Sequence, residues 1–253
     1  MSMYETLVAA GIFLCLVVAS LGALVVSGRL PTPYLQDDTY NVVRLAANIF
    51  VVATSLVLGL LLNTAKNTFE AVDRNVHAFA TDLILLDRTL RHYGPEASDA
   101  RQRLAVYVRQ AVEGTWRADG SRVLDDRAAE RLLDEVGNAL VAIRPSDPVR
   151  AELWREAQIN LQNVVKRRWS LIEESEGTIP AAFLVMLVAW LVLIFASFGY
   201  RAPQNAVVVT TLVVAAFLIA GSIYLILDMD LPFQGSIQIS PAALQRVEEQ
   251  LRR

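Results

Sequence analysis

The chain has 253 residues, of which 54% are hydrophobic and 19% are charged, a composition too apolar for an ordinary soluble enzyme. Its formal net charge of −3 provides no basic field, which excludes a nucleic-acid partner. The charges are concentrated in residues 64–178, which hold 17 of the 23 Lys and Arg and 19 of the 26 Asp and Glu. The sequence therefore predicts a protein that lies partly in lipid and partly in water.

Four stretches without any charged residue predict four transmembrane helices: residues 6–28, 45–65, 177–200 and 202–227. Each is long enough, because about 20 residues of α-helix cross the ~30 Å hydrocarbon core of a bilayer. We expect the first two helices at about 5–28 and 42–65 and the other two within 177–227. In the first helix, small residues spaced by four predict close packing against another helix: Gly11, Cys15 and Ala19.

The second span carries a polar stripe on one side. At 100° per residue, seven polar or small residues fall within about 100° of the helix circumference. They are Asn41, Arg44, Asn48, Ser55, Gly59, Asn63 and Lys66, with Val52 as the apolar residue among them. No Gly or Pro lies between Gly59 and Gly94, so we expect the helix to continue to about residue 92. The stripe then continues as Glu70, Asp73, Arg74 and His77.

Such a stripe is not expected to face hydrocarbon, where polar groups remain without hydrogen-bond partners. Two interpretations meet this requirement. In the first, the stripe packs against the other three spans of the same chain. In the second, several copies of the chain surround an axis, and the stripe lines a pore whose apolar constriction near Val52 gates by dewetting. The continuation from Glu70 to His77 would then line a vestibule. Periodicity alone leaves both interpretations open.

Residues 66–176 predict a helical domain in water, so the expected fold class is all-α. The continuation of the second span carries a heptad seam that stops at Tyr93-Gly94-Pro95: Phe69, Val72, Val76, Phe79, Leu83, Leu86 and Leu90. Further helices are expected at about 98–116, 122–143 and 148–175. Ser146-Asp147-Pro148 opens the last of them with a cap and a proline at the first helical position.

After the fourth span, residues 228–253 predict a tail with a turn, an extended connector and a short helix opened by Ser240-Pro241. With four spans, both termini and the 66–176 domain share one side of the membrane. Basic residues near the membrane ends are frequent on that side, among them Lys66, Arg74 and the run Lys166-Arg167-Arg168. They are scarce on the other side, which has Arg29 and Arg201, with Arg44 at the mouth of the second span. The positive-inside rule therefore places the termini and the domain in the cytoplasm.

Residues suited to enzyme chemistry are few. The histidines are His77 and His92, and the sequence contains no metal-binding, phosphate-binding or Ser-His-Asp pattern. We therefore expect no enzyme and no cofactor, and packing roles for Trp116, Trp154 and Trp169. No Asp, Glu or His lies within a predicted span, which argues against a transporter coupled to protons or sodium.

Several short motifs together resemble one family. They are Leu58-Gly59-Leu60, Leu85-Leu86-Asp87-Arg88-Thr89-Leu90, Arg167-Arg168 ahead of Ile179-Pro180, Phe198-Gly199-Tyr200, and residues 227–235 with the sequence Leu-Asp-Met-Asp-Leu-Pro-Phe-Gln-Gly. Over about residues 45–245 the chain resembles the bacterial membrane proteins called bestrophin-like, a domain of unknown function. The family is similar to bestrophins, so the resemblance implies a pentameric ion channel with four spans, a pore along the second span and a cytoplasmic helical part.

The resemblance also directs attention to the turn after the fourth span, made by Asp228, Asp230, Pro232, Phe233 and Gly235. Animal bestrophins carry an acidic Ca²⁺ site at a comparable place. Two carboxylates are too few for Ca²⁺, which takes 6 to 8 oxygen ligands, so we expect no metal here. The expectation is a solvated turn, or an ion pair with an arginine of a neighbouring helix.

The sequence thus favours a bestrophin-like homo-oligomer of the bacterial inner membrane with a passive ion pathway along the second span. Its expected partners are the lipid bilayer, inorganic ions and further copies of the chain, with the pentamer implied by the resemblance. The alternative is a non-conducting membrane scaffold or sensor whose cytoplasmic helical domain binds a protein.

Overall fold

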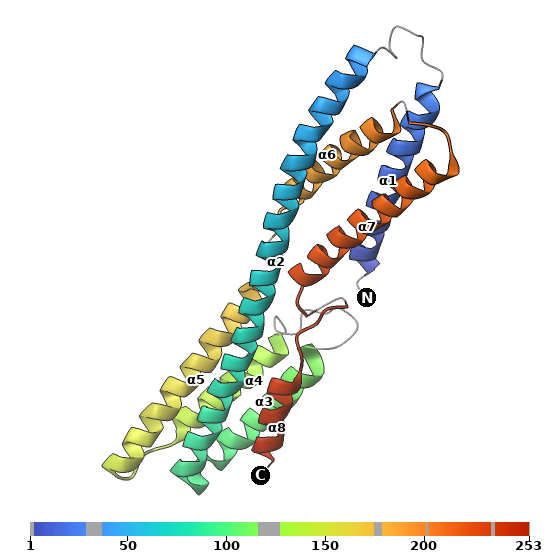
Figure 1. Ribbon diagram of the computed structural model, residues 1–253. Helices are drawn as coiled ribbons and strands as arrows, with labels where there is room; N and C mark the ends of the chain where they lie inside the picture. The colour runs from blue at the N-terminus through green and yellow to red at the C-terminus, as the bar shows by residue number, and fades with distance from the viewer. Residues whose placement is uncertain are drawn as a thin grey trace. The chain divides into compact units, whose positions relative to one another are not determined.

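The computed structural model describes residues 3–28, 37–115, 127–174, 179–200, 202–233 and 236–252. All regular secondary structure in these ranges is helical, which confirms the predicted fold class. The chain forms two compact units, drawn together in Figure 1. The first contains Met1–Asn67 and Thr178–Asp230, and the second contains Thr68–Gly177 and Leu231–Arg253.

The first unit is made of apolar helices. They are α1 (Met3–Ser27), the first part of α2 (Asp37–Tyr93), α6 (Ala181–Gly199) and α7 (Ala206–Asp230). All four are long and apolar enough to cross a membrane. Helix α1 packs against both α6 and α7, as Figure 1 shows. Their shared core is built from Ile12, Leu16, Leu187, Leu191, Phe195, Ala216, Ala220 and Ile223.

Helices α1 and α6 are in close backbone contact at Gly199. A Cβ atom built on Gly199 would lie 2.0 Å from the backbone oxygen of Ser20. The predicted small-residue contact of α1 is therefore wrong within this chain. Gly11 has no heavy atom within 4 Å of its Cβ position, and Cys15 is exposed, because α1 buries the side that carries Leu16 and Ser20.

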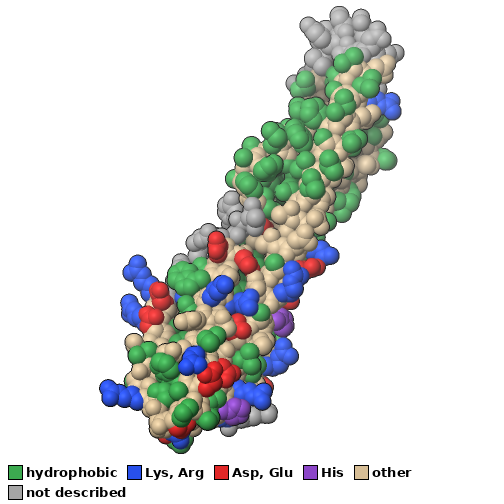
Figure 2. All heavy atoms as spheres, turned by 90° about the vertical axis from the view of Figure 1, so that its left-hand side faces the viewer, with side chains coloured by type: hydrophobic (Ala, Val, Ile, Leu, Met, Phe, Trp, Pro, Cys, Tyr) green, Lys and Arg blue, Asp and Glu red, His purple; other side chains and the backbone are tan. Residues whose placement is uncertain are grey.

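The second unit is a helical bundle. It contains the rest of α2, the 3₁₀ turn η2 (Pro95–Ala97), α3 (Ser98–Thr115), α4 (Arg127–Ala142), α5 (Pro148–Glu174) and α8 (Ala242–Leu251). The heptad seam of α2 lies in its core: from Val72 to Leu90 the seam residues are at most 2% exposed, and Phe69 packs at the edge. On the face drawn in Figure 2, hydrophobic side chains cover the first unit and charged ones gather on the second.

The ends of these helices follow the predicted signals. Helix α2 stops at Tyr93, where Gly94 takes a φ of 111°, a left-handed conformation that favours glycine. At the start of α5, the backbone N–H of Arg150 donates to Oδ1 of Asp147 at 2.9 Å and lowers the pKa of that carboxyl. Trp116 and the predicted helix start at 122–126 lie outside the described residues.

The region after the fourth span differs from its prediction at one point. Helix α7 extends to Asp230, three residues beyond the expected end at 227, so Asp228 and Asp230 belong to its last turn and not to the tail. In the described part of the tail, Ser240 Oγ accepts a hydrogen bond from the N–H of Ala242 at 3.3 Å. Helix α8 then buries the predicted face of Leu244, Val247 and Leu251.

Tyr107 of α3 lies in the core of the second unit with no solvent exposure, and its hydroxyl has no hydrogen-bond partner in the described part of the chain. We expect Tyr107→Phe to leave stability unchanged or to raise it by about 1 kcal/mol, because an unsatisfied buried hydroxyl costs roughly that much. Thermal unfolding in detergent at pH 7 tests this. If the substitution lowered the free energy of unfolding by more than about 1 kcal/mol, the hydroxyl would have to be hydrogen-bonded in the native protein.

The same residue predicts a pH dependence. Burial raises the pKa of the Tyr107 phenol, and the charge of Arg168 opposes that rise only in part. Since the unfolded phenol loses its proton first, stability is expected to fall as the pH rises above about 10. The difference in melting temperature between wild type and Tyr107→Phe should therefore widen between pH 8 and pH 10.5.

Candidate functional site

The polar stripe of α2 lies on the exposed side of that helix. In the first unit, Asn41, Arg44, Asn48, Ser55, Gly59, Asn63 and Lys66 are all exposed, and Val52 is 71% exposed. The predicted residues are thus brought to one face, as their spacing requires. Packing of the stripe against the other spans of the same chain, the first interpretation above, is not what the structure shows.

The opposite side of α2 makes the contacts within the chain. Ala47, Thr54 and Ala65 are at most 6% exposed. On the same side Val57, Leu58 and Leu61 pack against the core of α1, α6 and α7, and the ring of Phe50 lies 6.3 Å from that of Trp190. Helix α2 is therefore held by its apolar back, which leaves the stripe facing outward.

The amide side chains of the stripe have no hydrogen-bond partner within the described residues. This holds for Asn41, Asn48 and Asn63, whereas the hydroxyl of Ser55 donates to the backbone oxygen of Val51 at 2.8 Å. In hydrocarbon an unsatisfied amide costs several kcal/mol. These side chains therefore require water or another polypeptide chain in front of them.

The charged continuation of the stripe belongs to the second unit. Nη1 of Arg74 lies 3.7 Å from Oε2 of Glu70, and Nδ1 of His77 lies 3.7 Å from Oδ2 of Asp73. All four side chains are at least 42% exposed. These are pairs one helical turn apart on a solvated face, which contribute little to stability.

The two aspartates at the end of α7 are buried, so the expectation of a solvated turn is wrong. Asp228 has no exposed surface and Asp230 is 6% exposed. Oδ2 of Asp230 accepts a hydrogen bond from the N–H of Ile179 at 3.2 Å, just ahead of α6. In the rest of the motif, Pro232 is buried and Phe233 packs on the core of the second unit, while Gly235 lies outside the described residues.

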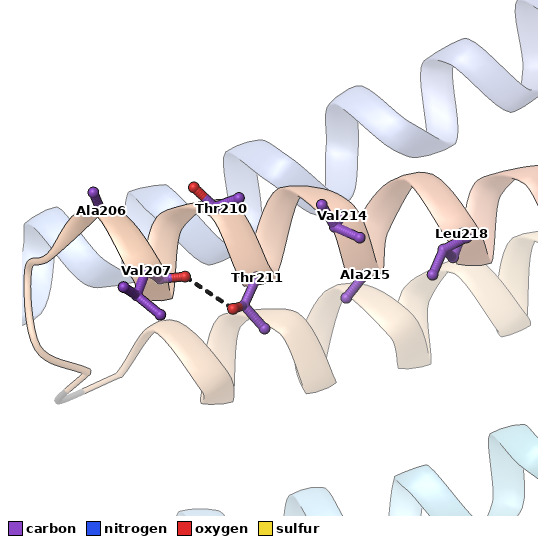
Figure 3. A pocket seen from close by; sticks show the side chains of 7 residues that line it. All are labelled: Ala206, Val207, Thr210, Thr211, Val214, Ala215 and Leu218. Atoms are coloured by element: carbon purple, nitrogen blue, oxygen red, sulfur yellow. Dashed lines mark hydrogen bonds between the residues drawn. The ribbon is translucent and has the colours of Figure 1, made fainter.

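No group of three or more His, Cys, Asp or Glu side chains that could hold a metal ion occurs in the described part of the chain. An open hollow of about 630 Å³ runs along α7 (Figure 3), lined by Ala206, Val207, Thr210, Thr211, Val214, Ala215 and Leu218. The hydroxyl of Thr211 donates to the backbone oxygen of Val207 at 2.8 Å. The lining is apolar apart from the two threonine hydroxyls, and it contains no side chain that titrates near neutral pH.

One charged cluster was missed at the sequence level. Asp87 of α2 is 1% exposed and accepts hydrogen bonds from Arg91 at 2.7 Å and Arg101 at 2.6 Å. Both arginines also reach the end of α8: Nη2 of Arg101 lies 3.2 Å from the oxygen of Leu251, and Nη2 of Arg91 lies 3.5 Å from that of Gln250. Asp87 directly follows Leu86 in the sequence and so lies at the edge of the heptad seam. This position was the sequence feature that could have indicated a buried carboxylate.

Comparison with known families and structures gives one consistent result. A family model described as the bestrophin-like domain matches residues 14–244. Crystal structures of two mutants of a bacterial bestrophin homologue from Klebsiella pneumoniae are similar in fold. The first has 15% identity and a TM-score of 0.68 and covers 97% of this chain and 99% of the other. The second has 16% identity and a TM-score of 0.65, and it covers 96% of this chain and 97% of the other.

A further crystal structure, described only as a membrane protein, has 17% identity and a TM-score of 0.60 and covers 96% of this chain and 97% of the other. Comparison with curated proteins finds no match. At these identities the solved structures show the fold alone, and the family model extends over most of the chain.

Proposed function

Since the chain belongs to the bestrophin-like family of membrane proteins, we propose that it forms a homo-oligomeric ion channel whose second spans surround a passive ion pathway. The pathway is lined by Asn41, Arg44, Asn48, Val52, Ser55, Gly59, Asn63 and Lys66. Its vestibule carries Glu70, Asp73, Arg74 and His77. The assembly is a pentamer in the bacterial inner membrane, with both termini and the second unit in the cytoplasm.

One observation carries this proposal: the unpartnered amides of the α2 stripe face away from every other span of their own chain. A ring of such helices provides water along its axis, which satisfies the amides, and it leaves the apolar sides of α1, α6 and α7 to lipid and to neighbouring copies. The fold similarity to a bestrophin homologue supports the same arrangement. Val52 supplies the apolar ring that empties of water when the channel is closed.

The direct test is electron microscopy of the protein in lipid nanodiscs. We expect a closed ring of copies with Asn48, Val52 and Ser55 around an axial opening. A monomer, or a dimer in which the stripe of one chain is covered by the other, would contradict the pathway. The protein would then be examined as a scaffold with a cytoplasmic binding partner.

Substitutions along α2 test conduction itself in ion-flux assays with reconstituted liposomes. Val52→Ser is expected to raise flux several-fold, because a hydroxyl ring stays hydrated, and Asn48→Leu is expected to lower it. Ile49→Ala is the matched control: Ile49 is 68% exposed on the same helix but lies to one side of the stripe. Equal flux in all four proteins would contradict a pathway along α2.

A further inference from the structure

Helices α2 and α5 are joined in the second unit by polar side chains at regular intervals. Three pairs make direct hydrogen bonds, and from one pair to the next the residue number rises by seven on α2 and falls by seven on α5. The two helices are therefore antiparallel, with one pair at every second turn. We call these pairs the polar rungs: Asn75 with Glu174, Asp82 with Arg167 at 3.3 Å, and Thr89 with Asn160 at 3.1 Å.

The turns between the polar rungs are apolar on both helices. Their side chains are at most 4% exposed and belong to the core of the second unit. Polar and apolar layers thus alternate from turn to turn, as in a coiled coil in which one of the two core positions is polar. The apolar layers are built from Phe79, Leu86 and Tyr93 on α2 and from Ala157, Val164 and Leu171 on α5.

Arg167 connects two of the polar rungs. Its Nε donates to Oδ2 of Asp82, and its Nη1 donates to Oδ1 of Asn75 at 3.3 Å. The side chain of Arg167 is 38% exposed and that of Asp82 is 17% exposed. A partly exposed ion pair adds little to stability, because both groups give up hydration in order to meet. The pair has a larger effect on alignments of the helices that would separate the two charges.

A shift of α5 along α2 by one turn, about 5.4 Å, would bring each polar rung residue opposite an apolar layer. Arg167 would then face Phe79 after a shift in one direction and Leu86 after a shift in the other. Both of these side chains have no solvent exposure. A charge held against a buried apolar side chain without its partner is strongly disfavoured.

A shift by two turns would bring polar rung residues together again, but in the wrong pairs. In one direction Asp82 would face Glu174, and the two carboxylates would repel each other. In the other direction Thr89, which is 5% exposed, would face Leu153 and lose its hydrogen bond from Asn160. Apolar layers alone would accept all of these alignments, because one apolar side chain replaces another in each of them.

We propose that the polar rungs fix the register of α5 on α2: they select one axial alignment of the two helices and exclude those displaced by one or two turns, while the apolar layers supply the packing. Helix α2 carries the chain into the second unit, and α5 carries it out toward α6. The register therefore sets the point at which the chain leaves this unit. The proposal rests on the fold of the second unit and not on ion conduction.

Disulfide cross-linking measures the register in a Cys15→Ser background, which removes the single native cysteine. Thr89→Cys is combined with Asn160→Cys to report the observed alignment. It is combined with Ala157→Cys or with Val164→Cys to report alignments displaced by about one turn in either direction. Oxidation is followed on non-reducing gels, and products that migrate as single chains are counted. In the protein with the other two rungs intact, the 89–160 pair is expected to oxidise several-fold faster than either displaced pair.

The central rung is then replaced by Asp82→Leu together with Arg167→Leu, which keeps this layer filled but makes it apolar. Since Thr89→Cys already removes the third rung, one rung remains. We expect at least one displaced pair to oxidise as fast as the 89–160 pair in this protein. The matched control is Asp99→Leu with Arg103→Leu, an ion pair within α3 at 3.0 Å, which should leave the several-fold preference unchanged.

Two results would overturn the proposal. If the protein with both leucines keeps its preference for the 89–160 pair, the apolar layers set the register by themselves. If all three pairs oxidise equally fast with the central rung intact, the polar rungs do not hold one alignment. Asp82→Ala provides a test that does not require the leucine variant to fold, since the partly exposed Arg167 can turn to water. Displaced pairs should gain rate relative to the 89–160 pair in this protein, and an unchanged ratio would also contradict the proposal.

Discussion

Gly199→Ala is expected to prevent stable folding of the first unit. The added Cβ would lie 2.0 Å from the oxygen of Ser20 and 3.0 Å from its carbonyl carbon, and both are backbone atoms of α1. A flexible side chain could move aside, but here two whole helices would have to separate. Ordinary overpacking of a core costs about 1–3 kcal/mol, and this substitution should reach or exceed the upper end. The added Cβ would also lie 3.1 Å from the Cβ of Ala23, so a small sideways shift of the helix would not relieve the clash.

Thermal unfolding of detergent-solubilised protein, followed by tryptophan fluorescence, measures the effect. Gly22→Ala and Gly221→Ala are matched controls, since neither Cβ would meet an atom within 4 Å in the described structure. Both controls should keep or slightly raise the melting temperature, because alanine is the better helix former. A Gly199→Ala protein that melts with the controls would mean that α1 and α6 are not in backbone contact.

This contact shows a limit of sequence reasoning about helix packing. Spacing identified small residues in α1, Gly11, Cys15 and Ala19, but a short side chain does not indicate which side of a helix meets a neighbour. The side that packs is chosen by the larger apolar residues, Ile12 and Leu16, which the core of α6 and α7 covers. Every side of α1 is apolar, so periodicity could not choose between them.

The stripe of α2 was predicted because polar residues in an apolar helix stand out at every turn. What the sequence left open was whether other spans cover it, since that depends on where α1, α6 and α7 lie. The structure answers this for one chain through the packed side of Thr54 and Ala65. The solvated turn expected for the aspartates of α7 was wrong for a related reason: charge next to an apolar run suggests a water boundary, but here the helix continues and buries both carboxylates. The alternative expectation, an ion pair with an arginine of a neighbouring helix, stays a prediction.

Asp87→Asn is expected to loosen the C-terminal helix α8 and to destabilise the second unit. The buried carboxylate binds Arg91 and Arg101, and these two arginines hold the last carbonyls of α8, where positive charge also favours the helix dipole. Removing one partner of a buried pair costs about 3–5 kcal/mol. Because the arginines keep 43% and 30% of their surface and can turn to water, we expect a loss of about 2–3 kcal/mol.

The control is an exposed ion pair between an aspartate and an arginine on the surface of the same bundle. Asp99 accepts a hydrogen bond from Arg103 at 3.0 Å but is 63% exposed, so Asp99→Asn should change stability by less than about 1 kcal/mol. Hydrogen exchange separates a local role from a general loss: amides of α8 should exchange faster in Asp87→Asn before global unfolding begins, and should be unchanged in Asp99→Asn. If the amides of α8 keep their protection from exchange in Asp87→Asn, the burial of Leu244 and Val247 is enough to hold α8 in place without the two arginines. The role of Asp87 would then be limited to neutralising the charges of Arg91 and Arg101.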